Sequence, residues 1–228
     1  MKTAICIGIG MLALVGDVSS AAPPAPRPAA AAGRVGGITA PWSVSGVSLG
    51  MSPQAASAAL RAAGYKFEYR YMGRSWQGEV ANKVSNLRGI RIPDGAQVVR
   101  KEDYRKGQEF IQVDYAAGPA GPYVYRVIYS ISENAIDAER FRAAVLGRYG
   151  QPSLKWDTEL LYCAPGEPVC ERTGSLGTNQ LPNLTVYILG ARGRSLELYQ
   201  GERAYKAYEA AVKAEAERLY PKKDKPSF

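Results

Sequence analysis

The chain of 228 residues contains no histidine. This absence excludes a Ser-His-Asp or Cys-His catalytic arrangement and every zinc, iron or copper site that depends on imidazole ligands. The glycine patterns of the P-loop and of dinucleotide-binding turns are also missing from the sequence. We therefore expect no catalytic residue, no cofactor site and no metal site.

Carboxylates remain a possible source of chemistry, because a glycosidase needs only two of them. No pair of acidic residues stands in an apolar stretch that would raise one pKa. The candidates are Glu102, Asp103, Asp114, Glu133, Asp157, Glu159, Glu167 and Glu171. A hydrolase of cell-wall glycans therefore stays open only as an alternative.

Long apolar runs are confined to the N-terminus. Lys2 precedes the apolar stretch Ala4–Val15, and the small residues Ser19 to Ala22 follow it. A stretch of about a dozen residues suits a signal peptide and is too short for the ~20 residues that cross a bilayer. We predict a signal peptide over 1–22, cleaved after Ser20 or Ala22, and a periplasmic or secreted protein. The alternative is a short membrane anchor.

The chain has only three cysteines, and Cys6 lies inside the predicted signal peptide. Cys163 and Cys170 flank the turn-forming residues Ala-Pro-Gly-Glu-Pro. An oxidising compartment and two strands leading into this turn favour a disulfide between them. A disulfide that closes such a short loop stabilises the folded state by about 2–3 kcal/mol in the chain-entropy model. We interpret the predicted disulfide as structural.

The formal net charge of +8 comes from 29 Lys and Arg against 21 Asp and Glu. An exported protein meets anionic lipid or envelope polymer rather than nucleic acid, so we expect no nucleic-acid partner. The only dense cationic run, in the basic tail 221–228, is typical of a solvated chain end.

The body of the chain shows helices followed by runs of strands, which predicts an α+β fold. Residues 23–41 form an Ala/Pro-rich linker, and the first α+β unit spans 42–133. Helices are predicted after Ser52 and after Ser75, because each serine is a good N-cap and a glycine follows at Gly64 and Gly89. The predicted strands are Tyr65–Tyr71, Gln97–Tyr104, Glu109–Ala116 and Tyr123–Ile131.

A second α+β unit is predicted over 134–220. Asp137 caps a helix that runs to Tyr149 and stops at Gly150. Strands are expected at about 154–163, 170–173, 184–191 and 195–199. A C-terminal helix is predicted from Glu202 to Leu219, with an apolar stripe of Tyr205, Tyr208, Val212 and Leu219. The two units either form a tandem duplication or share a similar order by chance.

Two short segments resemble a known family. Gly46-Val-Ser-Leu-Gly50-Met51-Ser52-Pro-Gln54-Ala55 resembles the first helix of the SmpA/OmlA (BamE-like) envelope proteins, and Arg148-Tyr149-Gly150-Gln151-Pro152 is similar to their helix end. That family shares its helix-plus-antiparallel-sheet module with the β-lactamase inhibitor proteins, which are tandem duplications of it. The resemblance implies a binding module of the bacterial envelope without catalytic residues. The lipid-anchor cysteine of the assembly lipoproteins is not present here.

Tyrosine is abundant, with 15 Tyr against 4 Phe. Tyr69, Tyr71, Arg74 and Trp76 cluster within eight residues, and Tyr, Trp and Arg are the residues most enriched at interface hot spots. We predict that these four bind a partner, although tyrosines are also good strand formers. The sequence thus predicts a non-catalytic exported binding or assembly module whose partner is an envelope protein. An inhibitor of a periplasmic or secreted enzyme is the main alternative.

Overall fold

The computed structural model describes residues 40–164, 172–173, 178–189 and 193–221. The predicted signal peptide, most of the linker, Cys170 and most of the basic tail lie outside these residues. The described elements follow the order α1 (Pro53–Ala62), β1 (Lys66–Arg74), α2 (Trp76–Arg88), β2 (Gln97–Lys106), β3 (Glu109–Gly118), β4 (Gly121–Ile131), α3 (Ala138–Tyr149), β5 (Leu154–Lys155), β6 (Glu159–Cys163), β7 (Arg172–Thr173), β8 (Thr178–Asn179), β9 (Asn183–Tyr187), β10 (Arg194–Tyr199) and α4 (Glu202–Leu219).

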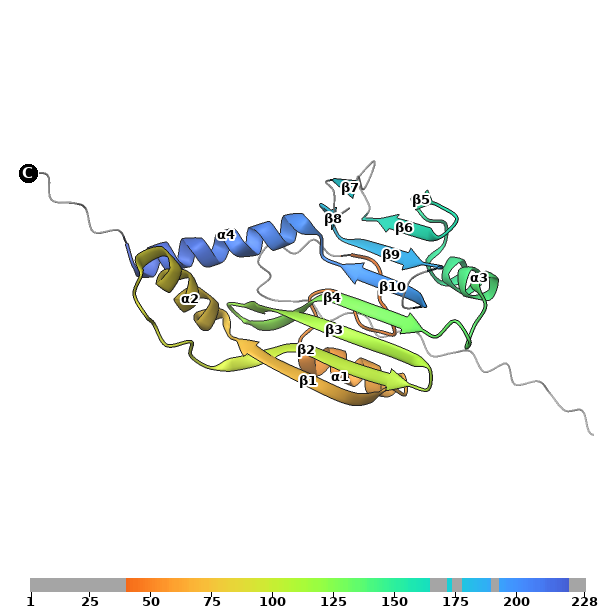
Figure 1. Cartoon of the computed structure of the whole chain (residues 1–228), viewed down its shortest axis with the longest axis horizontal. Helices are drawn as coiled ribbons and strands as arrows, with labels where there is room; N and C mark the ends of the chain where they lie inside the picture. The colour runs from red at the N-terminus through yellow and green to blue at the C-terminus, as the bar shows by residue number, and fades with distance from the viewer. Residues whose placement is uncertain (1–39, 165–171, 174–177, 190–192, 222–228) are drawn as a thin grey trace, which may run out of the picture.

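An eight-stranded antiparallel sheet forms the centre of the molecule (Figure 1), in the order β1-β2-β3-β4-β10-β9-β6-β5. The strands of the first predicted unit and those of the second meet where β4 pairs with β10, from Arg126↔Tyr199 to Ile131↔Arg194. The predicted α+β fold of helix-plus-antiparallel-sheet units with a C-terminal helix is confirmed.

Local sequence signals explain the helix boundaries. The side chains of Ser52, Ser75 and Asp137 cap α1, α2 and α3 by accepting a hydrogen bond from a backbone N–H in the first turn. Gly89 ends α2 in the left-handed conformation, at φ 67°. These helices begin and end where the sequence predicts because a cap and a stop signal act over a few residues.

The strand predicted at about 154–163 is divided in two. β5 and β6 form a hairpin in which Leu154 pairs with Leu161, and the Trp156 N–H donates to the Glu159 carbonyl across the turn. Asp157 and Thr158 lie in this turn, and such residues favour turns over a continuous strand. The sheet therefore ends in a short edge strand on this side.

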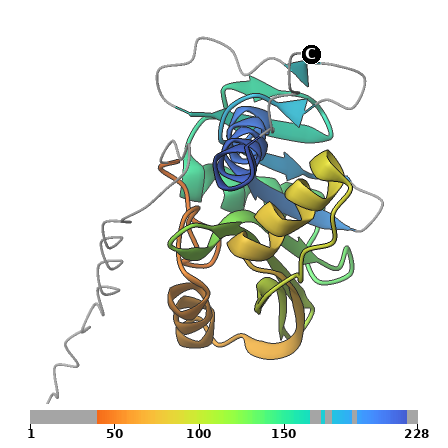
Figure 2. The same cartoon turned by 90° about the vertical axis from the view of Figure 1, so that its left-hand side faces the viewer.

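One apolar core joins both predicted units. It lies between the sheet and helices α1 and α3, with Leu60 and Phe141 packed against strand residues such as Val113 and Leu184. Figure 2 shows α1 on one face of the sheet and α2 toward the other. A second, smaller cluster joins α2 to α4.

The buried side of α4 differs from the predicted stripe. Ala204, Val212 and Ala216 are buried, whereas Tyr205 and Leu219 are exposed. The helix packs on α2 from the first predicted unit, through contacts that include Val80 and Val84. Small alanines are buried here because they allow two helices to approach closely. The predicted apolar stripe was therefore wrong at Tyr205 and at Leu219.

Candidate functional site

The four residues predicted to bind a partner lie at the junction of β1 and α2. β1 is the edge strand of the sheet, and its Tyr69 and Tyr71 are 51% and 54% exposed. Arg74 ends this strand with an exposed side chain. Trp76 begins α2 and packs edge-to-face on Tyr208 of α4, with ring centroids 5.8 Å apart. The structure thus leaves Tyr69, Tyr71 and Arg74 on the surface and places Trp76 in the contact between two helices.

Two irregularities in the pairing of β1 with β2 orient the exposed tyrosines. The register shifts between Phe67 and Tyr69 and again between Tyr71 and Met72. The Lys101 ammonium lies 5.7 Å from the centre of the Tyr69 ring, which is within cation–π range. Bulges of this kind also discourage an edge strand from pairing with another strand. We therefore expect β1 to present side chains to a partner rather than its backbone.

A groove of about 530 Å³ opens beside Tyr71 and Arg74, where β1 ends and α2 begins. We call it the β1–α2 groove. Residues from β1, α2, β2, β3, β4 and the turn before β2 line it: Tyr71, Met72, Gly73, Arg74, Glu79, Asp94, Gln97, Arg100, Lys101, Asp114, Tyr115 and Tyr125. Most of these side chains are polar or charged.

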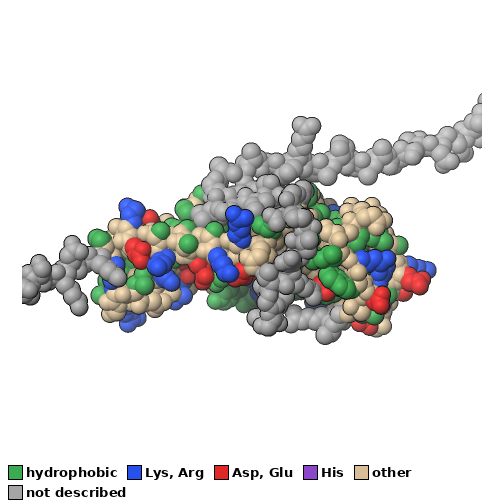
Figure 3. Space-filling view, turned by 90° about the horizontal axis from the view of Figure 1, so that it is seen from above, with side chains coloured by type: hydrophobic (Ala, Val, Ile, Leu, Met, Phe, Trp, Pro, Cys, Tyr) green, Lys and Arg blue, Asp and Glu red, His purple; other side chains and the backbone are tan. Residues whose placement is uncertain are grey.

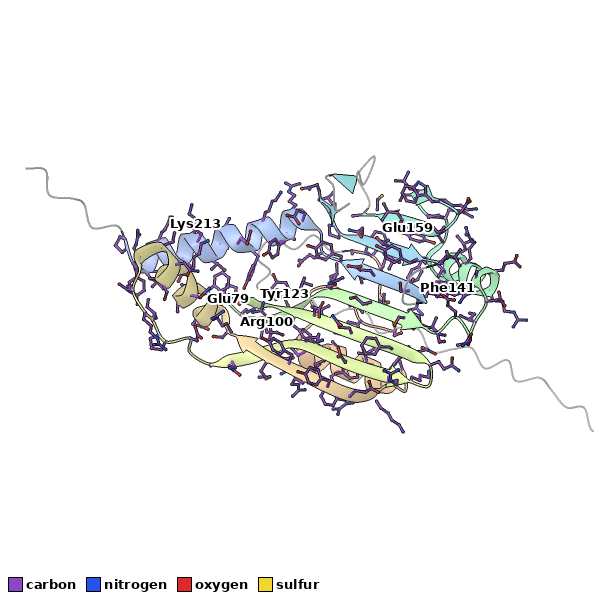
Figure 4. All side chains as sticks on the ribbon, viewed as in Figure 1. Glu79, Arg100, Tyr123, Phe141, Glu159 and Lys213 are labelled. Carbon is purple, nitrogen blue, oxygen red and sulfur yellow. The ribbon has the colours of Figure 1, made fainter. Side chains whose placement is uncertain are left out.

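Arg100 is the central residue of the β1–α2 groove. Its Nη1 lies 2.7 Å from Glu79 Oε1 on α2 and donates to the Arg74 carbonyl at 3.1 Å, and its Nε donates to the Tyr115 carbonyl at 3.0 Å. Figure 4 shows Glu79 and Arg100 close together where α2 meets the sheet. One guanidinium thus ties together β1, α2, β2 and β3 and fixes the shape of the groove.

Two glycines make this arrangement possible. A Cβ on Gly73 would come within 2.8 Å of Arg100 Cγ, so the missing side chain leaves space for the arginine. A Cβ on Gly78 would come within 2.2 Å of the Asp94 carbonyl oxygen. The first turn of α2 can therefore pack directly on the turn that precedes β2.

Each acidic side chain in the β1–α2 groove has a polar partner. Glu79 pairs with Arg100, and Asp94 pairs with Arg74 at 3.0 Å. Asp114 accepts a hydrogen bond from Gln112 at 2.9 Å and lies 3.8 Å from the Arg126 guanidinium. Burial raises the pKa of Asp114, while Gln112 and Arg126 act in the opposite direction. The charges of the groove are thus largely balanced within it.

A smaller pocket of about 70 Å³ continues from the groove beneath the first turns of α4, and shares Arg100 and Tyr125 with it. Five tyrosines line this tyrosine pocket: Tyr123, Tyr125, Tyr199, Tyr205 and Tyr208. The Tyr208 hydroxyl is buried and has no hydrogen-bond partner among the described residues. Burial raises the pKa of Tyr208 to about 12, so the hydroxyl keeps its proton at neutral pH.

No family model, curated protein or solved structure matches the chain. Within the described ranges, no three Cys, Asp or Glu side chains gather in a way that could hold a metal ion.

The predicted disulfide lies at some distance in the sequence from this site. Cys163 ends β6, next to the Ser153 hydroxyl, which accepts a hydrogen bond from its N–H. Cys170 is outside the described residues, so the bridge stays a prediction.

The sequence did not indicate Arg100 or the tyrosine pocket, and it indicated Asp114 only as one of several candidate carboxylates. Arg100 lies in the middle of a correctly predicted strand, and nothing in its neighbours marks it. Only the pairing of β1, β2 and β3 brings Arg74, Arg100 and Asp114 together.

Proposed function

We propose that the protein is a non-catalytic binding module of the bacterial envelope that holds a segment of a partner protein in the β1–α2 groove. The observation that carries this proposal is the exposure of Tyr71 and Arg74 in the lining of a charge-balanced groove, with the exposed Tyr69 two residues before Tyr71 on the same strand. Aromatic and arginine side chains of this kind contribute most of the binding energy in protein interfaces.

The proposal is supported by the way the groove would receive a peptide. Tyr71 offers a large apolar ring at the rim, and the interior offers polar groups that are already oriented by hydrogen bonds. Preorganised groups lose little conformational entropy on binding. The adjoining tyrosine pocket has room for one small side chain.

A non-catalytic role is supported by the pairing of the carboxylates. A glycosidase needs one carboxylic acid with a raised pKa and a second, ionised carboxylate across a cleft. Asp114 has a raised pKa, but Glu79 and Asp94 are held by Arg100 and Arg74. Export to the envelope rests on the predicted signal peptide and on the resemblance to the BamE-like proteins.

The test is affinity capture from bacterial envelope extract with the chain expected after signal cleavage, residues 23–228. A double variant, Tyr71→Ala with Arg74→Ala, removes two exposed side chains from the rim of the groove. Leu189→Ala is the matched control, because Leu189 is exposed and follows β9 at the opposite end of the sheet. Thermal melting of each variant checks that folding is unchanged.

A partner that is captured by the wild type and by Leu189→Ala should bind at least tenfold more weakly to the double variant. This factor follows if each of the two side chains contributes about 1–2 kcal/mol of binding free energy, as hot-spot residues do. Equal capture by all three proteins would show that the groove is not the binding site. Hydrolysis of cell-wall glycan by the wild type, abolished in Asp114→Asn, would overturn the non-catalytic assignment.

A further inference from the structure

Four large apolar side chains are exposed together at one end of the molecule. Leu87 lies in the last turn of α2, Ile90 follows that helix, and Leu219 and Tyr220 lie at the end of α4; all four are between 41% and 48% exposed. We call this group the apolar tip. Figure 1 shows the C-terminal half of α4 beside α2 at the left end of the molecule.

Hydrogen bonds hold the two segments of the apolar tip in place. The Arg88 guanidinium donates to the Tyr220 carbonyl from Nη2 at 2.9 Å and from Nε at 3.2 Å. Behind the tip, Val80 and Val84 of α2 pack with Val212 and Ala216 of α4. The four apolar side chains are therefore presented on a fixed framework.

Arginines stand next to residues of the apolar tip in the sequence: Arg88 follows Leu87, Arg91 follows Ile90 and Arg218 precedes Leu219. Arg91 is exposed and makes no ion pair within the described part of the chain. After Pro221 the sequence continues with Lys222, Lys223, Asp224 and Lys225. The nearest acidic groups on α4 are Glu215 and Glu217, and Glu215 accepts two hydrogen bonds from Arg218. Figure 3 shows Lys and Arg as well as Asp and Glu side chains among hydrophobic ones at this end.

An apolar groove of about 430 Å³ adjoins the tip. Its lining includes Trp76, Val80, Ile92, Leu219 and Tyr220, together with the carboxylate residue Glu215, which pairs with Arg218. The apolar surface thus continues from the tip into the space between α2 and the turn before β2.

We infer that the apolar tip binds the surface of an anionic bilayer. Exposed apolar and tyrosine side chains with interspersed cations are the features that place a protein in the interfacial region of a membrane. Each Lys or Arg near an anionic surface adds about 1 kcal/mol, or roughly a fivefold gain in affinity. None of the helices in the described ranges is long and apolar enough to cross a membrane.

This inference goes beyond the proposed function, because the two surfaces are separate. The β1–α2 groove lies at the first turn of α2, and the apolar tip lies at its last turn. From Glu79, the α2 residue that lines the β1–α2 groove, to Leu87 in the tip is eight residues, or about 12 Å at a rise of 1.5 Å per residue. A membrane-bound molecule would therefore leave the groove open to a partner.

The test is co-sedimentation with vesicles of phosphatidylglycerol and phosphatidylcholine, compared with vesicles of phosphatidylcholine alone. Residues 23–228 are used, because the apolar stretch of the predicted signal peptide would itself bind lipid; every described element lies within 40–221. Two variants test the apolar and the electrostatic contributions to membrane binding. Ile90→Ser with Leu219→Ser reduces the apolar surface, and Arg91→Gln removes one charge.

The controls match each variant at the opposite end of the molecule. Leu189→Ser removes an exposed leucine after β9, and Lys155→Gln removes an exposed cation on β5. We expect wild-type binding to anionic vesicles that weakens with salt. The affinity should fall about fivefold in Arg91→Gln and at least tenfold in the apolar variant. The two controls should bind as the wild type does.

Three results would overturn the inference. The protein could bind the two kinds of vesicle equally, or it could fail to bind anionic vesicles at low salt. The control variants could also weaken binding as much as the tip variants do. Envelope-protein capture that depends on Ile90 and Leu219 but not on lipid would show that a protein covers the tip instead. These results are independent of the test for the groove, which relies on Tyr71 and Arg74.

Discussion

Arg70 on the edge strand β1 covers the carboxylate of Glu102 on β2, with Nη2 2.6 Å from Oε1. The Glu102 side chain is fully buried, whereas that of Arg70 is 47% exposed. The Tyr104 and Tyr115 hydroxyls both donate to the other carboxylate oxygen, at 2.9 and 2.8 Å. A buried negative charge in the first half of the sheet is thus satisfied by one guanidinium and two phenols.

We predict that Arg70→Met destabilises the fold by about 2–3 kcal/mol. A buried ion that loses its partner costs about 3–5 kcal/mol, and the partial exposure of Arg70 reduces this figure because water can enter. Urea unfolding measures the change. Arg105→Met is the control, because it breaks the exposed pair with Glu68 on the same two strands and should cost less than about 1 kcal/mol.

A second variant distinguishes the charge from the packing of Arg70. Arg70→Met combined with Glu102→Gln leaves no buried charge, so it should be less destabilised than Arg70→Met alone. If Arg70→Met and Arg105→Met lower the free energy of unfolding equally, pairing with the buried Glu102 carboxylate is worth no more than pairing with the exposed Glu68.

Two helical glycines should respond to alanine with opposite signs. Gly147 lies inside α3, and a Cβ there would meet no atom within 4 Å. Gly147→Ala is therefore expected to stabilise the fold by about 0.5–1 kcal/mol, because alanine has a higher helix propensity than glycine. Gly78→Ala should destabilise instead, since its Cβ would lie 2.2 Å from the Asp94 carbonyl oxygen and force α2 away from the turn before β2.

Thermal or urea unfolding of the two alanine variants checks these signs. Gly78→Ala should also reduce binding at the β1–α2 groove, because Glu79 and Asp94 would shift with the backbone. A stabilised Gly78→Ala protein would mean that the turn before β2 relaxes freely, which would contradict the close packing.

Local features of the fold were predictable from the sequence, and contacts between distant segments were not. Ser52, Ser75 and Asp137 mark the helix starts because a cap needs only the residues of the first turn. The join between β4 and β10 depends on residues about 70 positions apart, such as Arg126 and Glu197. A pattern of alternating side chains cannot specify which strand will be the neighbour.

The candidate site, too, was predictable where it depends on neighbours in the sequence and not where it depends on distant segments. The clustering of Tyr69, Tyr71 and Arg74 in the sequence was sufficient to place them near one another on the surface, because neighbours on a strand stay close. The sequence could not reveal that Trp76 packs on Tyr208 from the C-terminal helix. Nor could it reveal that Arg100 organises the groove, since each of its partners belongs to a different element.

Asp103 should reduce stability at neutral pH. Its Oδ1 is buried with no hydrogen-bond partner among the described residues, and burial raises its pKa despite Lys101 at 3.7 Å. Because the folded-state pKa is raised, the contribution of Asp103 to stability is complete below the unfolded pKa of 3.8 and is lost as pH rises through the folded value. Asp103→Asn should therefore be more stable than the wild type at pH 7, by up to about 1 kcal/mol.

The advantage of Asp103→Asn should shrink as the pH falls toward 3, where the wild-type carboxyl is protonated too. Urea unfolding of both proteins at several pH values measures the difference. An advantage that stays constant with pH would mean that the effect comes from packing and not from ionisation.

Buried tyrosines should make the protein unfold in alkali. Burial raises the pKa of Tyr65, Tyr104, Tyr199 and Tyr208 from 10.0 to about 12. A raised pKa means that each of these phenols stabilises the fold fully below pH 10 and loses that contribution as the pH rises toward 12. We expect a cooperative loss of circular dichroism in this window, together with a rise in phenolate absorbance.

Tyr208→Phe tests the alkaline transition at a single residue. The Tyr208 hydroxyl has no partner within the described residues, so its removal leaves no unpaired group and should be neutral or slightly stabilising at pH 7. The same change removes one ionisable group and should shift the alkaline midpoint upward. Tyr115→Phe provides the contrast, because it deletes a hydrogen bond to the buried Glu102 and should cost about 1–2 kcal/mol at pH 7. If Tyr208→Phe unfolds at a lower pH than the wild type, its hydroxyl must have a stabilising role that the static geometry does not show.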